Sequence, residues 1–201
     1  MIKQLANNEI DLEVALSRLM IIASDINNEE LYKWAESELN GYSSNDALPN
    51  YRKLNIGYIT YSGINGRMQV TNQPIPLTSF TPDERKLITG AFVFESIRSL
   101  QQYAHQDKSL IKDLTFLAES FFNRQGIRCT SINMHYDSTK FIDILSNIRT
   151  KLLSMFIKLD KEFGCLDELD IDIKGIDTDR LKDINDDLYS IIYTDDKAEV
   201  L

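Results

Sequence analysis

Each of the two histidines of this chain follows an arginine by seven residues, as Arg98 to His105 and as Arg128 to His135. Seven residues are almost two turns of an α-helix, so Arg98 and His105 would share one helix face in a helical segment. The histidine could then transfer a proton while the guanidinium stabilises a phosphate. Because such a spacing also arises by chance, we favour the interpretation that both histidines are ordinary surface or partly buried side chains.

The spacing of Arg98 and His105 resembles the arginine–histidine motif of HEPN-type ribonucleases. Ser99 follows the arginine, where those enzymes usually have Asn, Asp or His. The resemblance implies a ribonuclease-type toxin as an alternative function, with Arg98 and His105 as its catalytic candidates. The sequence suggests no other catalytic residue.

Motifs for metal ions and nucleotides are missing from the sequence. Cys129 and Cys165 stand apart, and neither paired His or Cys spacings typical of zinc nor a glycine-rich phosphate-binding loop occurs. Asp170, Asp172 and Asp177 superficially resemble a calcium loop, but the alternation with isoleucine favours a solvated edge strand. We therefore predict no metal site and no cofactor.

Negative charge is concentrated in the last fifth of the sequence. Residues 160–201 hold 14 of the 31 acidic and 5 of the 22 basic residues, a balance of −9 that equals the net charge of the chain. The remainder is neutral and has no basic stripe, so direct nucleic-acid binding is not favoured. Residues 165–201 could instead mask a basic partner, which makes an acidic antitoxin or nucleic-acid mimic a further alternative.

Targeting signals are also missing. No apolar run approaches the roughly 18 residues of a membrane span, and no apolar stretch typical of a secretory signal follows the first residues. Two isolated cysteines make no disulfide framework. We expect a cytoplasmic protein without a membrane span.

Apolar periodicity predicts an α+β, mainly helical fold. Steps of three and four over residues 11–26 and 29–40 predict a helical hairpin that ends at Gly41, and alternation over residues 52–71 predicts a β-hairpin with an Asn65-Gly66 turn. Three further helices are expected. They cover residues 81–100, 109–123 and 137–163, the last being one long core helix with an apolar seam.

The remaining segments complete the predicted organisation. Residues 127–134 have a weak strand pattern, which would give a small antiparallel sheet, and residues 169–173 and 181–191 suggest an edge strand and a short helix. We predict a globular domain over residues 1–163 and an acidic C-terminal extension over residues 164–201. The seam of the long helix would serve a homodimer or the core of a monomer equally well.

One aromatic–arginine cluster flanks a polar loop in the first quarter of the sequence. It consists of Trp34, Tyr42, Tyr51 and Arg52. Such a cluster on a loop can form a hot spot for a partner, which makes these four residues the partner-binding candidates. Alternatively, the rings pack under the loop while the arginine pairs with Glu38 or Asp46, and we favour this packing interpretation.

Three segments, in this order, resemble the AbiTii family, named after one product of an abortive-infection system. They are Glu38-Leu39-Asn40-Gly41-Tyr42 with Leu48-Pro49-Asn50-Tyr51-Arg52, then Ile75-Pro76-Leu77, then Ile148-Arg149-Thr150-Lys151-Leu152-Leu153. The resemblance implies a bacterial antiviral component that limits phage spread by harming or arresting its own host cell. It implies no set of catalytic residues.

We therefore predict a component of an abortive-infection-type defence system that acts through protein–protein contacts. The expected partner is a protein from the same defence operon. The sequence favours a binding protein over an enzyme without deciding between them.

Overall fold

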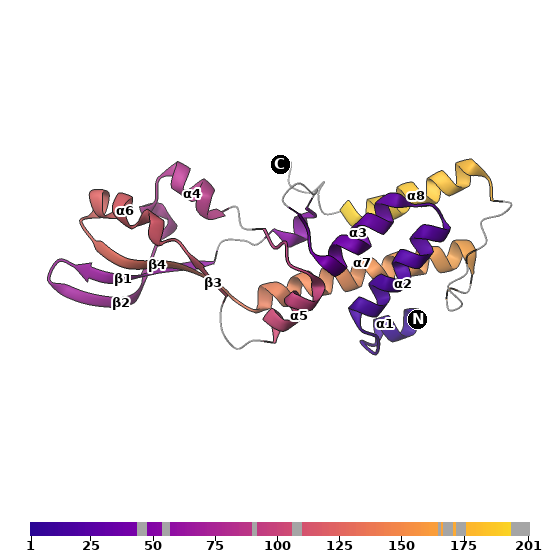
Figure 1. Cartoon of the computed structure of the whole chain (residues 1–201), viewed down its shortest axis with the longest axis horizontal. Coiled ribbons are helices and arrows are strands. Elements are labelled where there is room, and N and C mark those ends of the chain that lie inside the picture. The colour runs from indigo at the N-terminus through magenta and orange to yellow at the C-terminus, as the bar shows by residue number, and fades with distance from the viewer. Residues whose placement is uncertain are drawn as a thin grey trace. The chain divides into compact units, whose positions relative to one another are not determined.

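The computed structural model describes residues 1–43, 48–53, 57–89, 92–105, 110–164, 166, 171 and 176–193. The chain divides into two compact units (Figure 1). Unit 1 comprises residues 1–52, 94–102 and 142–201, and unit 2 comprises residues 53–93 and 103–141. The predicted boundary after residue 163 was drawn from charge and family pattern, whereas these two units are defined by contacts within the chain. That boundary therefore stays a prediction.

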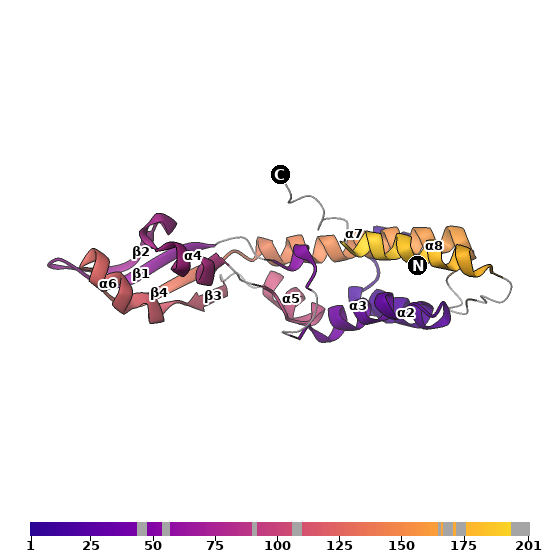
Figure 2. The ribbon, with the colours of Figure 1, turned by 90° about the horizontal axis from the view of Figure 1, so that it is seen from above.

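Unit 1 is built from helices. Its elements are α1 (Ile2–Ala6), α2 (Leu12–Asp25), α3 (Glu29–Asn40), the 3-10 turn η1 (Asn50–Arg52), most of α5 (Ile97–Ala104), most of α7 (Thr139–Phe163) and α8 (Thr178–Tyr193). Figure 2 shows α2 and α3 in one layer and α7 and α8 in the other. The predicted helical hairpin, the long helix and the short C-terminal helix are thereby confirmed.

Polar residues at the helix starts explain where α2 and α3 begin. The Asp11 carboxylate accepts a hydrogen bond from the Glu13 N–H at 2.9 Å, and the Asn28 side chain accepts one from the Leu31 N–H at 2.8 Å. The Asn28 amide also donates to Asn185 Oδ1 at 2.9 Å. This second bond joins the start of α3 to α8.

The apolar seam of α7 lies in the core of unit 1. Its central residues are fully buried with the facing side chains of α2 and α8, and the core includes Leu16, Leu19, Ala23, Ile148, Leu152, Met155, Leu159, Ile184 and Leu188. The seam therefore packs within the chain itself, as expected if it forms the core of a monomer. A homodimer stays a prediction.

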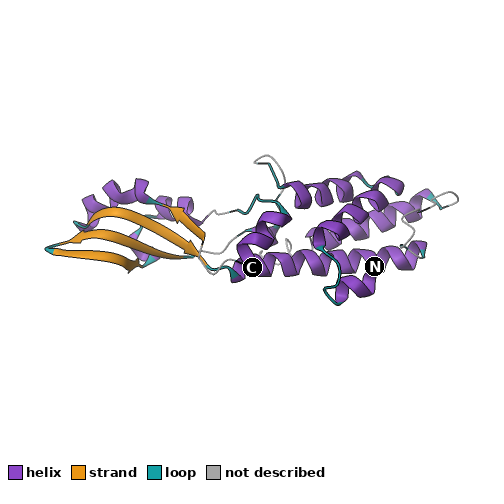
Figure 3. Cartoon of the chain, turned by 60° about the horizontal axis from the view of Figure 1, so that its bottom comes forward, coloured by secondary structure: helices purple, strands orange, loops and turns teal. Residues whose placement is uncertain are grey.

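Unit 2 is a four-stranded antiparallel sheet with helices on one face (Figure 3). The strands are β1 (Tyr58–Asn65), β2 (Met68–Ile75), β3 (Leu110–Asp113) and β4 (Arg128–Tyr136), in the spatial order β2-β1-β4-β3. The covering elements are η2 (Leu77–Ser79), α4 (Pro82–Thr89), η3 (Thr115–Leu117) and α6 (Ala118–Gln125). The rings of Phe80 and Tyr61 lie 5.7 and 6.4 Å from that of Phe121, between sheet and helices.

The β-hairpin and the mainly helical α+β class are confirmed. Asn65 pairs with Met68, so Gly66 and Arg67 form a two-residue turn, and Gly66 has a φ of +63°. The asparagine of the predicted Asn-Gly turn is thus the last residue of β1. A glycine next to it supplies the positive φ that a tight hairpin turn needs.

Two predicted helices are wrong in their extent. The helix expected over residues 81–100 is divided into α4 and α5, because Phe92 forms a β-bridge with Lys53 and the Phe94 carbonyl accepts a hydrogen bond from the Tyr42 N–H. Residues 110–113 form the edge strand β3 instead of the first turn of a helix. In both places a tertiary backbone partner overrides a helical pattern.

A reciprocal cap starts α4 in unit 2. The Thr81 N–H donates to Glu84 Oε2 at 2.8 Å, and the Glu84 N–H donates to Thr81 Oγ1 at 3.3 Å. Glu84 also accepts from the Ser120 hydroxyl at 2.7 Å and pairs with Arg124 at 2.7 Å. Burial opposes ionisation of Glu84, but these hydrogen bonds outweigh it and lower the pKa of Glu84 to about 2.

The predicted strand over residues 169–173 lies outside the described residues except for Ile171, which is buried. Within the described ranges, no helix is long and apolar enough to cross a bilayer.

Candidate partner-binding site

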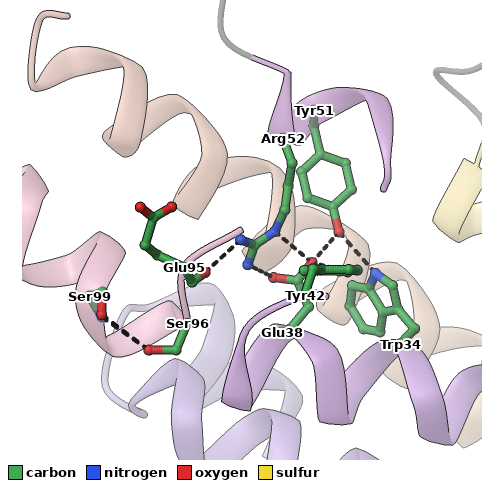
Figure 4. Close-up of polar contacts among 8 residues, drawn as sticks. All are labelled: Trp34, Glu38, Tyr42, Tyr51, Arg52, Glu95, Ser96 and Ser99. Carbon is green, nitrogen blue, oxygen red and sulfur yellow. Dashed lines mark hydrogen bonds and ion pairs between the residues drawn. The ribbon is translucent and has the colours of Figure 1, made fainter. Parts of the chain in front are cut away.

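A buried ion pair lies at the centre of the aromatic–arginine cluster (Figure 4). The side chains of Arg52 and Glu38 have no exposed surface. Arg52 Nε donates to Glu38 Oε1 at 3.1 Å, its Nη2 donates to Oε2, and its Nη1 donates to the Glu95 carbonyl at 2.7 Å. These donors are arranged as a fork, the geometry in which guanidinium and carboxylate bind most strongly.

Three aromatic side chains extend the pair into a network. The Tyr42 and Tyr51 hydroxyls both donate to Glu38 Oε1, at 2.7 and 2.6 Å. The indole N–H of Trp34 donates to the Tyr51 hydroxyl oxygen at 2.9 Å. The carboxylate of Glu38 therefore accepts bonds from one arginine and two tyrosines, which satisfies a buried charge.

Local sequence explains how these side chains converge. Trp34 and Glu38 are one turn apart on α3, and Tyr42 follows just after the helix ends. Gly41 has a φ of +94°, and a Cβ at this position would lie 2.8 Å from the Phe94 carbonyl oxygen. Only glycine permits both the backbone turn and this close approach.

The second half of the cluster comes from η1. The Arg52 N–H donates to the Pro49 carbonyl at 3.0 Å, which closes a single 3-10 turn after the buried proline. This turn places Tyr51 and Arg52 next to each other, with their side chains directed toward Glu38 and Trp34 of α3 (Figure 4). Proline fixes the backbone angle with which the turn begins.

The environment fixes the protonation states of the network. Burial, together with the negative charge of Glu38, raises the pKa of Tyr42 and of Tyr51 well above 10, so both hydroxyls remain donors. Burial acts to lower the pKa of Arg52, but the Glu38 carboxylate outweighs it and raises that pKa overall. A charged pair surrounded by neutral donors results.

Lys151 connects the network to α7 and α8. Its side chain is 7% exposed, and its Nζ donates to the Ile191 carbonyl at 2.9 Å. The same Nζ lies 5.3 Å from the centre of the Tyr51 ring, within the range of a cation–π contact. The sequence indicated the burial of this lysine, because Lys151 follows the seam residue Ile148 by three positions and so lies on the same side of the helix.

A cavity of about 290 Å³ borders the network between α3 and α8. The rings of Trp34 and Tyr42 line it from the side of the network, and those of Tyr189 and Tyr193 line it from α8. Neither α8 tyrosine was among the residues predicted for the site. Tyr189 lies in the helix predicted over residues 181–191, and Tyr193 follows it by four residues, a spacing that would place both on one face had the helix been predicted to extend two residues further.

The four predicted partner-binding residues are thus brought together, and the arginine pairs with Glu38 as the packing interpretation expected. Asp46, the other expected partner of the arginine, lies outside the described residues. Trp34 and Tyr42 line the cavity. On the side away from the cavity lining, Trp34 is hydrogen-bonded to Tyr51, and the Tyr42 ring contacts the Arg52 guanidinium. Partner binding by these residues stays a prediction.

The ribonuclease candidates have different surroundings. Arg98 lies in α5 in unit 1, and its Nε is 3.3 Å from Glu13 Oε1. His105 belongs to unit 2 and follows Ala104, the last residue of α5. The helix that the predicted pairing requires therefore ends one residue before the histidine.

The second histidine is part of the sheet. His135 stacks on Tyr58 with ring centres 4.6 Å apart, and its Nε2 lies 2.8 Å from the Thr60 hydroxyl. Arg128 lies at the other end of β4, with its Cζ 5.9 Å from the centre of the Phe122 ring. Among the described residues, no group of three or more His, Cys, Asp or Glu side chains could hold a metal ion.

The fold and the network define a mainly helical α+β protein whose helical unit contains a buried arginine–carboxylate pair. The sequence matches the AbiTii family over residues 1–176, and the chain belongs to this family. Membership suggests a role in abortive infection, the defence of bacteria against phage. No curated protein and no solved structure matches the chain.

Proposed function

We propose that the chain acts in abortive-infection phage defence by binding a protein partner from the same operon through unit 1. The observation that carries the proposal is the aromatic wall beside the buried pair, whose rings are tied to that pair by hydrogen bonds and a cation–π contact. Trp34 and Tyr42 are held there by Tyr51 and Arg52, so the wall needs little ordering when a partner binds. Pre-organised aromatic side chains are typical of the residues that dominate interface energies.

The position of α8 supports the proposal. Its Tyr189 is 46% exposed although it lines the cavity, so a partner could reach the aromatic wall from solvent. The Asn28–Asn185 bond and the Lys151 bond hold this helix against the rest of unit 1. The cavity therefore has two fixed sides.

Copurification tests the proposal. The tagged full chain is expressed with the product of the neighbouring gene, and we expect that product to copurify with it and phage plating to fall. Tyr189→Ala should reduce both effects. Tyr32→Ala is the matched control, since it removes a comparably exposed tyrosine from α3 that lines a separate cavity.

A chain that purifies alone, and leaves phage plating unaltered in the presence of its neighbour, would overturn the proposal. Equal loss with both tyrosine variants would also count against it, because the effect would then not belong to this cavity.

A further inference from the structure

The lining of the α3–α8 cavity combines aromatic rings with oxygen acceptors. Glu30, Trp34 and Ser37 follow one another at steps of four and three, so they lie on one face of α3. From α8, the rings of Tyr189 and Tyr193 lie with their centres 4.7 Å apart and tilted by 44°.

This lining suits a cation. The face of an aromatic ring carries partial negative charge and attracts ammonium or guanidinium groups within about 6 Å. The neighbouring network already uses this interaction, since Arg52 Cζ lies 4.7 Å from the centre of the Tyr42 ring. Lys33 also borders the cavity, but its side chain is 73% exposed and its Nζ lies 3.8 Å from Glu29.

The charge of unit 1 points to the same kind of ligand. Its segments hold 25 acidic and 13 basic residues, a balance of −12, whereas those of unit 2 hold 6 acidic and 9 basic residues, a balance of +3. An acidic unit attracts basic partners over a distance and repels nucleic acid. The favoured occupant is therefore a basic segment of a protein.

We infer that this cavity receives an arginine side chain of the protein partner. A guanidinium can stack on aromatic faces and still donate several hydrogen bonds in its plane, which an ammonium cannot do. Glu30 and the Ser37 hydroxyl provide acceptors in the same cavity. The inference rests on the proposed function and names the chemistry of its partner.

Trp34 makes the inference directly testable. It is the single tryptophan of the sequence and lines the cavity, so its fluorescence reports occupancy. The full chain is titrated with an acetylated hexa-arginine peptide and with a hexa-glutamine peptide of equal length. We expect a saturable change in fluorescence with the arginine peptide and none with the neutral one.

Variants of Tyr189 that keep the net charge of the chain separate the contribution of its ring to peptide binding from that of its hydroxyl. Tyr189→Ala should weaken peptide binding about tenfold, whereas Tyr189→Phe should retain it, because a cation–π contact depends on the ring. Tyr32→Ala should bind like the unmodified chain. Circular dichroism confirms that each variant is folded.

Equal responses to the arginine and glutamine peptides would overturn the inference, as would unchanged affinity in Tyr189→Ala. These outcomes would leave the proposed function standing if the partner still copurifies. A partner that fails to copurify, with arginine-peptide binding retained, would instead overturn the proposed function and leave the cavity chemistry in place.

Discussion

Removal of one member of the Arg52–Glu38 pair is expected to destabilise unit 1 strongly. Arg52→Met leaves the Glu38 carboxylate with no exposed surface and with the two tyrosine hydroxyls as its remaining side-chain donors. An uncompensated buried charge costs about 3–5 kcal/mol. With a urea m-value of roughly 2 kcal/mol/M, the unfolding midpoint should fall by about 2 M.

The assay follows urea unfolding by the fluorescence of Trp34, which is 4% exposed in the folded chain and belongs to unit 1. Glu38→Leu alone should cost at least as much as Arg52→Met, since it removes both the carboxylate that faces the buried guanidinium and the acceptor of both tyrosines. The double variant removes both charges of the pair together. It should therefore be more stable than the sum of the single losses predicts, by at least about 2 kcal/mol.

The double variant should nevertheless remain less stable than the unmodified chain. Tyr42 and Tyr51 still lose their acceptor, and each unsatisfied buried donor costs about 1–3 kcal/mol. Losses that add to within about 0.5 kcal/mol would refute the reasoning, because the two side chains would then not interact. A loss below about 1 kcal/mol in Arg52→Met would refute it as well.

Three further predictions concern backbone geometry and pH. Gly41→Ala should cost about 3 kcal/mol in urea unfolding, because strain at a φ of +94° adds to the backbone clash, whereas Gly164→Ala, at a φ of +83° but with open space around it, should cost about 1 kcal/mol. Because the pKa values of Tyr42 and Tyr51 are raised in the folded chain, both tyrosines contribute their full stabilisation below pH 10. This stabilisation declines above pH 10, because the unfolded chain then releases protons that the folded chain retains. Between pH 10 and 11, circular dichroism should show unit 1 losing about 1 kcal/mol per tyrosine, and a Tyr42→Phe variant should lose half as much. For unit 2, the pKa of Glu84 near 2 against 4.5 when unfolded gives about 3 kcal/mol that is present above pH 4.5 and lost towards pH 2. The protection of the β1 and β4 amides from hydrogen exchange, expressed relative to their intrinsic exchange rate at each pH, should therefore fall between pH 5 and 3. Glu84→Gln should remove that pH dependence of the protection, as judged by the same measurement.

The apolar periodicity of the sequence correctly predicted the helices that are determined by residues within their own segments. The helices α2, α3 and α7 each bury an apolar face that recurs every three or four residues, and α2 and α3 follow directly after their capping residues Asp11 and Asn28. The edge strand β3 was predicted as helix because its ladder partner β4 begins 15 residues after it ends. A four-residue segment does not reveal from its own pattern which backbone it will pair with.

The candidate site shows the same limit at the level of side chains. Gly41 and Pro49 indicate a helix stop and a stiff loop, and Glu38 was one of two expected partners for the arginine. The contact of Gly41 with Phe94 joins segments more than 50 residues apart, and no local pattern indicates it. Tyr189 lies still further along the chain, in the segment that charge and the family pattern had marked as an extension.

The charge pattern takes on a different meaning once the chain is divided into its structural units. In the sequence, the negative charge belongs to a tail beyond a neutral body. In the structure, α8 is packed within unit 1, where its buried Ile184 and Leu188 lie in the same core as α7. Acids of α8 therefore contribute to the field around the α3–α8 cavity, so association with a basic partner should be steered by charge and slowed by salt. The aromatic contacts inside the cavity depend much less on salt, so salt should change the association rate more than the dissociation rate.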